Sequence, residues 1–135
     1  MKIIVDTSIW SLALRRKKVQ SIDEVKFLES LIDNQNICML GPIRQELLSG
    51  IKDPKQFKQL KETLSFYEDH QILTRDYELA AEYFNHCRSK GIQGSNIDFL
   101  ICAVSNRNHF PIFTTDKDFE KFSKVIQITL VRNVG

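Results

Sequence analysis

Four acidic residues stand at positions where carboxylates could act together. One follows a short run of β-branched apolar residues, and the others lie near helix starts or after a later strand; they are Asp6, Glu46, Asp98 and Asp116. Two carboxylates about 4 Å apart repel each other by roughly 4 kcal/mol at an effective dielectric constant near 20. If the fold gathers these side chains, we expect a cation to lie among them.

The type of ligand indicates which cation. Carboxylates with no Cys or His beside them favour a hard ion, Mg²⁺ or Mn²⁺. The hydroxyls of Thr7, Ser8 and Thr115 are expected to hydrogen-bond these carboxylates or the waters on the ion. Such an ion lowers the pKa of a bound water and offsets the charge that builds on a phosphate. The four acids therefore predict hydrolysis of a phosphodiester.

Each acid also has a structural interpretation, as a helix cap. Asp6 could cap the helix that starts after it, and Glu46 lies where the helix dipole favours a carboxylate. Asp98 completes the capping-box pattern Ser95-x-x-Asp98, and Asp116 could cap a short helix that follows it. The two interpretations are compatible, because one carboxylate can both cap a helix and bind an ion.

The elements that must position these acids alternate between strand and helix. The apolar runs that predict strands span residues 3–5, 37–40, 72–73, 111–114 and 125–131. Helical spacing of apolar residues predicts helices at 7–14, 22–32, 42–49, 54–66, 79–87, 97–104 and 116–122. This alternation is typical of a three-layer α/β/α sandwich with a central, mainly parallel sheet.

The carboxyl edge of such a sheet is where ligands bind. Asp6, Glu46 and Asp116 follow predicted strands and should share this edge. Asp98 lies in a helix that leads back into a strand, and this position need not place it there.

Composition sets limits on the class of protein. The 135 residues are 42% hydrophobic, which suits one domain spanning residues 1–135. The net charge of +2 does not by itself indicate nucleic acid. Three cysteines without C-x-x-C spacing argue against a disulfide framework and a zinc site. Because no apolar run suits a membrane span or a signal peptide, we expect a cytoplasmic protein.

Four blocks of the sequence resemble the PIN-domain family, and specifically its VapC-type toxin ribonucleases. They are IIVDTSIW (3–10), PIRQELLSG (42–50), GIQGSNIDFLICA (91–103) and IFTTDKDF (112–119). The resemblance extends in order and spacing along almost the whole chain. It implies a PIN-like fold and a Mg²⁺- or Mn²⁺-dependent endoribonuclease of a type II toxin–antitoxin system, with Asp6, Glu46, Asp98 and Asp116 as its acids. It also implies a homodimer that a cognate antitoxin inhibits.

The resulting hypothesis assigns a role to each acid. Asp6, Asp98 and Asp116 hold one or two ions, and Glu46 binds a second ion or orients the attacking water. We favour Asp116 over Asp118 because it directly follows the two threonines at the strand end. Attack by water should leave a 5′-phosphate and a 3′-hydroxyl.

Several interpretations stay open at this stage. The basic run Arg15, Arg16, Lys17 and Lys18 could contact RNA phosphates or could be a solvated loop. The aromatic residues are expected in the core or a dimer interface. A PIN-type nuclease of RNA processing or repair is an alternative function. A non-catalytic, Mg²⁺-binding receiver-like module is a more remote one, because it should show paired acids after its first strand.

Overall fold

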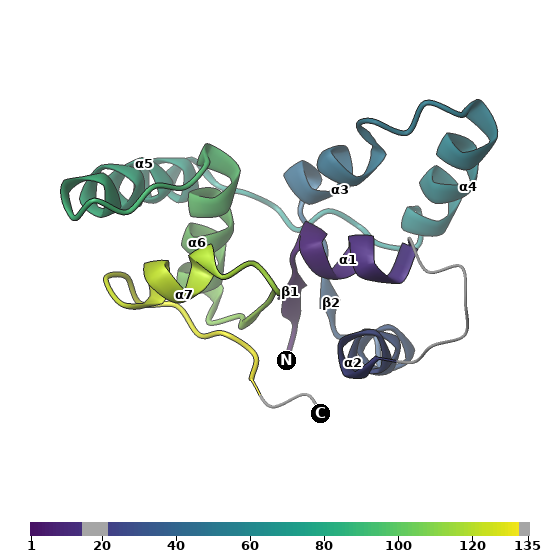
Figure 1. Ribbon diagram of the computed structural model, residues 1–135, viewed down its shortest axis with the longest axis horizontal. Coiled ribbons are helices and arrows are strands. Elements are labelled where there is room, and N and C mark those ends of the chain that lie inside the picture. The colour runs from purple at the N-terminus through teal and green to yellow at the C-terminus, as the bar shows by residue number, and fades with distance from the viewer. Residues whose placement is uncertain (15–21, 133–135) are drawn as a thin grey trace.

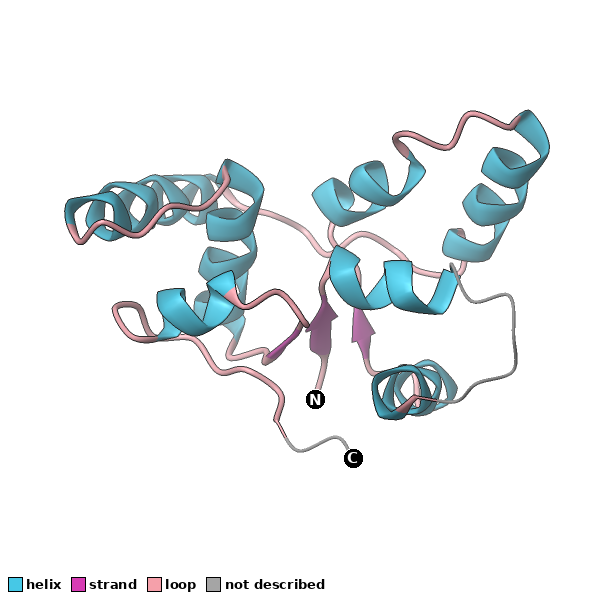
Figure 2. Cartoon of the chain, viewed as in Figure 1, coloured by secondary structure: helices cyan, strands magenta, loops and turns pink. Residues whose placement is uncertain are grey.

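The computed structural model describes residues 1–14 and 22–132. At its centre is a parallel three-stranded sheet, made of β1 (Ile3–Val5), β2 (Ile37–Cys38) and β3 (Ile112–Phe113) in the order β2-β1-β3. Figure 1 shows the sheet between two groups of helices, and Figure 2 shows how short the strands are beside them. The predicted α/β architecture with a parallel sheet is confirmed.

The helices account for most of the described chain. They are α1 (Thr7–Leu14), α2 (Asp23–Asp33), α3 (Gly41–Leu48), α4 (Pro54–Leu64), α5 (Thr74–Ser89), α6 (Asn96–Asn108) and α7 (Asp118–Ser123). In Figure 1, α5, α6 and α7 lie on one side of the sheet and α1 to α4 on the other. None of the helices in the described ranges is long and apolar enough to cross a membrane.

β1 is the central strand, since it pairs with β2 on one side and with β3 on the other. Ile4 and Val5 are buried, and Ile4 is the register partner of Cys38 on one side and of Ile112 on the other. A continuous run of β-branched residues suits this position, since neither face meets water. The strand therefore fixes where its next residue, Asp6, emerges.

α6 is the most deeply buried helix in the described part of the chain. All seven residues from 99 to 105 are buried, since α6 packs against both α5 and β3. The three cysteines, Cys38, Cys87 and Cys102, are free and buried. Burial raises the pKa of the Cys38 thiol to about 11. They are therefore unpaired thiols of the interior.

Two predicted strands are wrong. Residues 72–73 are not a strand, because the Asp76 carboxylate accepts a hydrogen bond from the Leu73 N–H (2.8 Å) and starts α5 at Thr74. Residues 125–131 make only one isolated bridge to the sheet, between Ile112 and Leu130. α2 starts at Asp23 and has Ile22 as its N-cap.

A close approach at Gly94 gives the first testable prediction. A Cβ atom there would lie 2.5 Å from Cζ of Phe122 and 3.0 Å from Cε2 of Phe99, and both rings are buried. Overpacking of this kind typically costs about 1–3 kcal/mol. We expect Gly94→Ala to lower the melting temperature measured by circular dichroism.

The matched control is Gly41→Ala. A Cβ atom at Gly41 would make ordinary contacts with Asp69, the nearest at 3.7 Å. This variant should melt within error of the wild type. Equal melting temperatures for both variants would show that the Gly94 loop is free to move away from Phe122.

Candidate active site

The structure places the four acids around the carboxyl edge of the sheet. Asp6 directly follows β1, Asp116 follows β3, and Glu46 lies in α3, which follows β2. α6 precedes β3 and packs beside it, so its first turn, with Asp98, returns to the edge where β3 ends (Figure 1). The sequence does not determine whether Asp98 lies at the carboxyl edge of the sheet. In the structure it lies at the same edge as Asp6.

Asp6 is a buried carboxylate held by two hydroxyl groups. Its side chain is 6% exposed, and its Oδ2 accepts hydrogen bonds from the hydroxyls of Ser8 (2.9 Å) and Thr114 (2.8 Å). The same hydroxyls accept the backbone N–H groups of Thr115 (3.1 Å) and Asp116 (2.9 Å). This network joins the ends of β1 and β3 and fixes Asp6 through Oδ2, whereas Oδ1 receives no hydrogen bond from the described residues.

Glu46 is tied to the same place through Thr7. The Thr7 hydroxyl donates a hydrogen bond of 2.6 Å to Oε1 of Glu46. Thr7 directly follows Asp6, so this contact brings α3 to the start of α1. Glu46 itself is exposed, and it therefore stands at the rim of the site rather than in its floor.

Asp98 and Asp116 both accept backbone N–H groups of neighbouring residues, although the N-cap of α7 is Lys117 and not Asp116 as predicted. Asp98 forms the predicted capping box, accepting the Ser95 N–H (3.0 Å) while its own N–H donates to the Ser95 hydroxyl (3.1 Å). Burial raises the pKa of the Asp98 carboxyl, and the negative charges of Asp116 and Asp6 raise it further. Asp116 accepts the Asp118 N–H (2.9 Å). Capping therefore does not remove these carboxylates from the shared site.

The PIN domain family matches residues 3–125, which is most of the chain. The chain belongs to the PIN domain family. No curated protein sequence shows significant similarity to it.

Two solved structures share the fold of this PIN domain. FitAcB from Neisseria gonorrhoeae has 18% sequence identity and a TM-score of 0.76, with 96% of each chain covered. VapBC2 from Rickettsia felis, bound to a DNA fragment from its promoter, has 20% identity and a TM-score of 0.77, covering 97% of this chain and 98% of that chain. At these identities the similarity establishes the fold.

The acids of this PIN domain face a common edge without forming a closed ligand set. In residues 1–14 and 22–132, no group of three Asp, Glu, His or Cys side chains is close enough to hold a metal ion. The assignment of the four acids as metal ligands therefore stays a prediction. The predicted RNA contact at Arg15, Arg16, Lys17 and Lys18 lies outside the described residues.

Thr114 is the site residue that sequence analysis missed. The prediction named Thr115, but its side chain is exposed and only its backbone N–H enters the network. The strand register contains the signal: because Val5 pairs with Phe113, the next residues, Asp6 and Thr114, emerge side by side. Asp118 contributes its backbone N–H to Asp116, and its carboxylate lies 3.9 Å from Nζ of Lys121.

The neighbouring threonines provide the second prediction. We expect Thr114→Val to lower activity or divalent-ion affinity by about 10- to 100-fold, the usual effect of losing a group that orients a metal ligand. Thr115→Val is the matched control and should be close to wild type, because this hydroxyl makes no hydrogen bond with the described residues and only the Thr115 backbone N–H enters the network. Titration calorimetry with Mn²⁺ measures the affinity, and equal affinities for the two variants would exclude the positioning role of Thr114.

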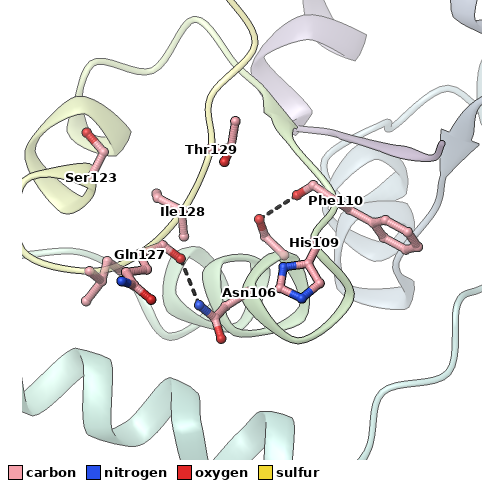
Figure 3. Close-up of a pocket in the computed structure, with 9 residues that line it drawn as sticks. Asn106, His109, Phe110, Ser123, Gln127, Ile128 and Thr129 are labelled. Atoms are coloured by element: carbon pink, nitrogen blue, oxygen red, sulfur yellow. Dashed lines mark hydrogen bonds between the residues drawn. The ribbon is translucent and has the colours of Figure 1, made fainter.

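A large pocket lies elsewhere and is not this site. It has a volume of about 410 Å³ between the C-terminal end of α6 and the last described segment, and it is lined by Asn106, His109 and Gln127 among others (Figure 3). The Asn106 amide donates a hydrogen bond to the Gln127 carbonyl (2.9 Å), and the Ser105 hydroxyl donates one to the Phe110 carbonyl (2.5 Å). None of its lining residues is acidic, so it does not offer the chemistry of the carboxyl edge.

Proposed function

We propose that this PIN domain is a Mg²⁺- or Mn²⁺-dependent endoribonuclease and the toxin of a toxin–antitoxin pair. The observation that carries the nuclease proposal is electrostatic. Burial is the largest cause of the raised pKa of Asp98, and the charges of Asp116 and Asp6, which lie far from it in the sequence, raise this pKa further. Like charges at one edge of the sheet repel each other, and a cation bound there would offset this repulsion.

The donors suit the proposed ion. All four are carboxylates, and one oxygen of Asp6 is free of hydrogen bonds from the described residues while the other is saturated by hydroxyls. Such oxygen donors are those that Mg²⁺ and Mn²⁺ prefer. When bound, the ion would supply an acidified water and charge neutralisation at the phosphate.

The protein's own contribution is orientation. Ser8 and Thr114 hold Asp6 with Oδ1 free, and Thr7 holds Glu46 at the rim, where this side chain could bind an ion or accept a proton from the attacking water. The burial of Asp6 keeps bulk water from its inner face. We expect a 5′-phosphate and a 3′-hydroxyl as product ends.

The toxin role rests on the structural neighbours. The FitAcB and VapBC2 structures resemble this chain over at least 96% of each chain's length. We propose that an antitoxin encoded beside this chain binds and inhibits it. The homodimer and the cytoplasmic location are further predictions of the same role.

Cleavage of RNA with and without a chelator tests the nuclease proposal. Purified protein should cut a structured RNA in Mg²⁺, EDTA should abolish the cut, and the products should be substrates for ligation through a 5′-phosphate. Cyclic-phosphate ends, or cleavage that survives EDTA, would exclude the mechanism. Co-expression with the neighbouring small open reading frame should give a stable complex without ribonuclease activity.

Two other functions are separated by the same assays. A PIN-type nuclease of RNA processing or repair would also cut RNA in Mg²⁺, but it would form no inhibitory complex with a neighbouring gene product. A receiver-like module would bind Mg²⁺ without cutting. Membership of the PIN domain family disfavours the receiver-like module.

The third prediction concerns the effect of Asp98 on the melting temperature when no divalent ion is present. Its raised pKa means that ionisation weakens the folded state, so stability is lost as pH rises from the unfolded-state pKa through the folded-state pKa. Asp98→Asn removes the charge and retains an oxygen for the Ser95 N–H. Without divalent ions at pH 7.5 we expect this variant to melt above the wild type, and Mg²⁺ should reduce the difference. A lower melting temperature in EDTA would contradict the electrostatic argument.

A further inference from the structure

A small pocket opens at the acidic end of α6. It has a volume of about 240 Å³ and lies between α5 and the loop that precedes α6; its lining residues are Phe84, Arg88, Ile92, Gln93, Gly94 and Phe99. Three other pockets all include Asn106, eight residues beyond Asp98 and therefore about 12 Å further along the helix. The small pocket is thus the one of these four that lies at the Asp98 end of α6.

Covalent connectivity places this pocket beside Asp98. Gly94 lines the pocket and is bonded to Ser95, whose N–H donates to Oδ2 of Asp98 at 3.0 Å. Phe99, which also lines the pocket, directly follows Asp98 in α6. A group bound in the pocket would therefore lie near the first turn of α6, which carries Asp98.

The lining combines an aromatic wall with free polar groups. Phe84 is half-buried and packs edge-to-face on the buried ring of Phe99, with ring centroids 5.6 Å apart. Arg88 and Gln93 are exposed, and within the described chain neither side chain has a hydrogen-bond or ion-pair partner. The Arg88 guanidinium and the Gln93 amide are thus available to a ligand.

We propose that this pocket binds one unpaired base of the RNA, next to the phosphate that is cut. The inference rests on the proposed ribonuclease function. Bases of single-stranded RNA are bound by stacking on aromatic rings and Arg planes and by hydrogen bonds to their edges. The volume is below the roughly 300–1,000 Å³ of pockets for drug-sized ligands, which suits a single ring system. The positive charge of Arg88 also favours a polyanion.

An abasic scan tests the proposal directly. Fluorescein-labelled octauridylate and octaadenylate, each with one abasic nucleotide at successive positions, are titrated against the non-cleaving Asp6→Asn protein by anisotropy. We expect one position at which loss of the base weakens binding about 5- to 100-fold, the range of one stacked base. In Phe84→Leu and in Arg88→Gln, introduced separately, this position-specific loss should shrink or disappear.

The chain offers a matched control on the same helix. Arg75→Gln makes the same charge change at the other end of α5, about 20 Å away, and should keep the full abasic effect. An abasic effect that is the same in Arg88→Gln and Arg75→Gln would overturn the proposal. So would a change of oligomeric state in Arg88→Gln, or a loss of antitoxin binding with RNA binding intact, because the pocket would then serve a protein interface.

A second measurement does not depend on cleavage. Uridine and adenosine 5′-monophosphates are added to metal-free wild-type protein, and the backbone amide shifts of Gln93 and Gly94 are followed by NMR. Shifts that ribose 5-phosphate does not reproduce support a base site, and equal shifts with ribose 5-phosphate overturn it. Wild-type protein that shows these shifts but cuts no RNA would contradict the proposed function and leave the base site standing.

Discussion

Replacing Asp6 with Asn is expected to reduce Mg²⁺-dependent RNA cleavage by more than about 100-fold. Loss of a group that only orients a metal ligand typically costs about 10- to 100-fold, so loss of a ligand should cost more. Asn keeps the shape of Asp and can still accept hydrogen bonds from Ser8 and Thr114 through one oxygen. The variant should therefore fold, and the effect should be confined to the free oxygen that becomes an amide nitrogen. Initial rates on a labelled RNA at fixed Mg²⁺ measure the change.

Asp118→Asn is the control for this experiment. It makes the same substitution near the same sheet edge, but this carboxylate lies toward Lys121 and accepts no hydrogen bond from the site. We expect its cleavage rate to stay within a few-fold of the wild type. Similar losses in both variants would indicate that general negative charge, and not a specific ligand, supports the reaction. Full activity of Asp6→Asn would remove Asp6 from the proposed metal site.

The sequence predicts the three strands of the sheet and the capping box of Asp98 because these depend on local patterns. The β-branched apolar run at residues 3–5 favours a short buried strand, and β1 spans these residues. Pro54 with Asp53 before it marks the start of α4, where Asp53 accepts the Lys55 N–H. The capping box of Ser95 and Asp98 is likewise formed as predicted. In each case the residues that decide the structure are neighbours in the chain.

The features that the sequence does not reveal depend on distant partners. Residues 72–73 look like a strand, but Asp76 with Arg107 behind it makes Leu73 a helix cap instead. The segment from 125 to 131 has strand character, yet it reaches the sheet only at Leu130. Thr114 becomes a site residue through its register with Asp6, 108 residues earlier. Register and ion pairs of this kind follow from the packed structure.

The hydrogen-bond partners of the four acids help to separate a capping role from a catalytic one. Asp6 and Glu46 accept their hydrogen bonds from side-chain hydroxyls, whereas Asp98 and Asp116 accept backbone N–H groups. A cap satisfies the helix or turn in which it lies, while a hydroxyl partner from another element orients the carboxylate toward a shared point. The hydrogen-bond partners of Asp6 and Glu46 therefore argue more directly for a functional site than the acids' sequence positions do.

The largest expected effect on stability comes from the ion pair between α5 and α6. Asp76 is 1% exposed, and its carboxylate accepts hydrogen bonds from Nε (2.6 Å) and an Nη (2.9 Å) of Arg107 and from the Leu73 N–H. Burial alone would raise the pKa of Asp76, but these donors outweigh it and lower the pKa. Arg107→Met keeps the apolar stem and leaves a buried carboxylate without its cation. Breaking a buried pair costs roughly 3–5 kcal/mol; because the Arg107 side chain is 20% exposed, we expect about 2–4 kcal/mol, measured by urea unfolding at pH 7.

The pH dependence and a double mutant separate this mechanism from simple loss of packing. In the wild type, the lowered pKa means that Asp76 contributes stability above its unfolded-state pKa, and this contribution is lost as pH falls through the folded-state pKa. In Arg107→Met, burial without the cation should raise the pKa of Asp76, so the difference in unfolding free energy from the wild type should narrow toward pH 4.

Adding Asp76→Asn to Arg107→Met should recover part of the lost unfolding free energy, because it removes the unpaired charge. Arg132→Met, which breaks the exposed pair with Glu120, should change the unfolding midpoint little. A difference for Arg107→Met that is independent of pH, with no recovery in the double mutant, would mean that the Arg107 stem and not its charge holds α5 against α6.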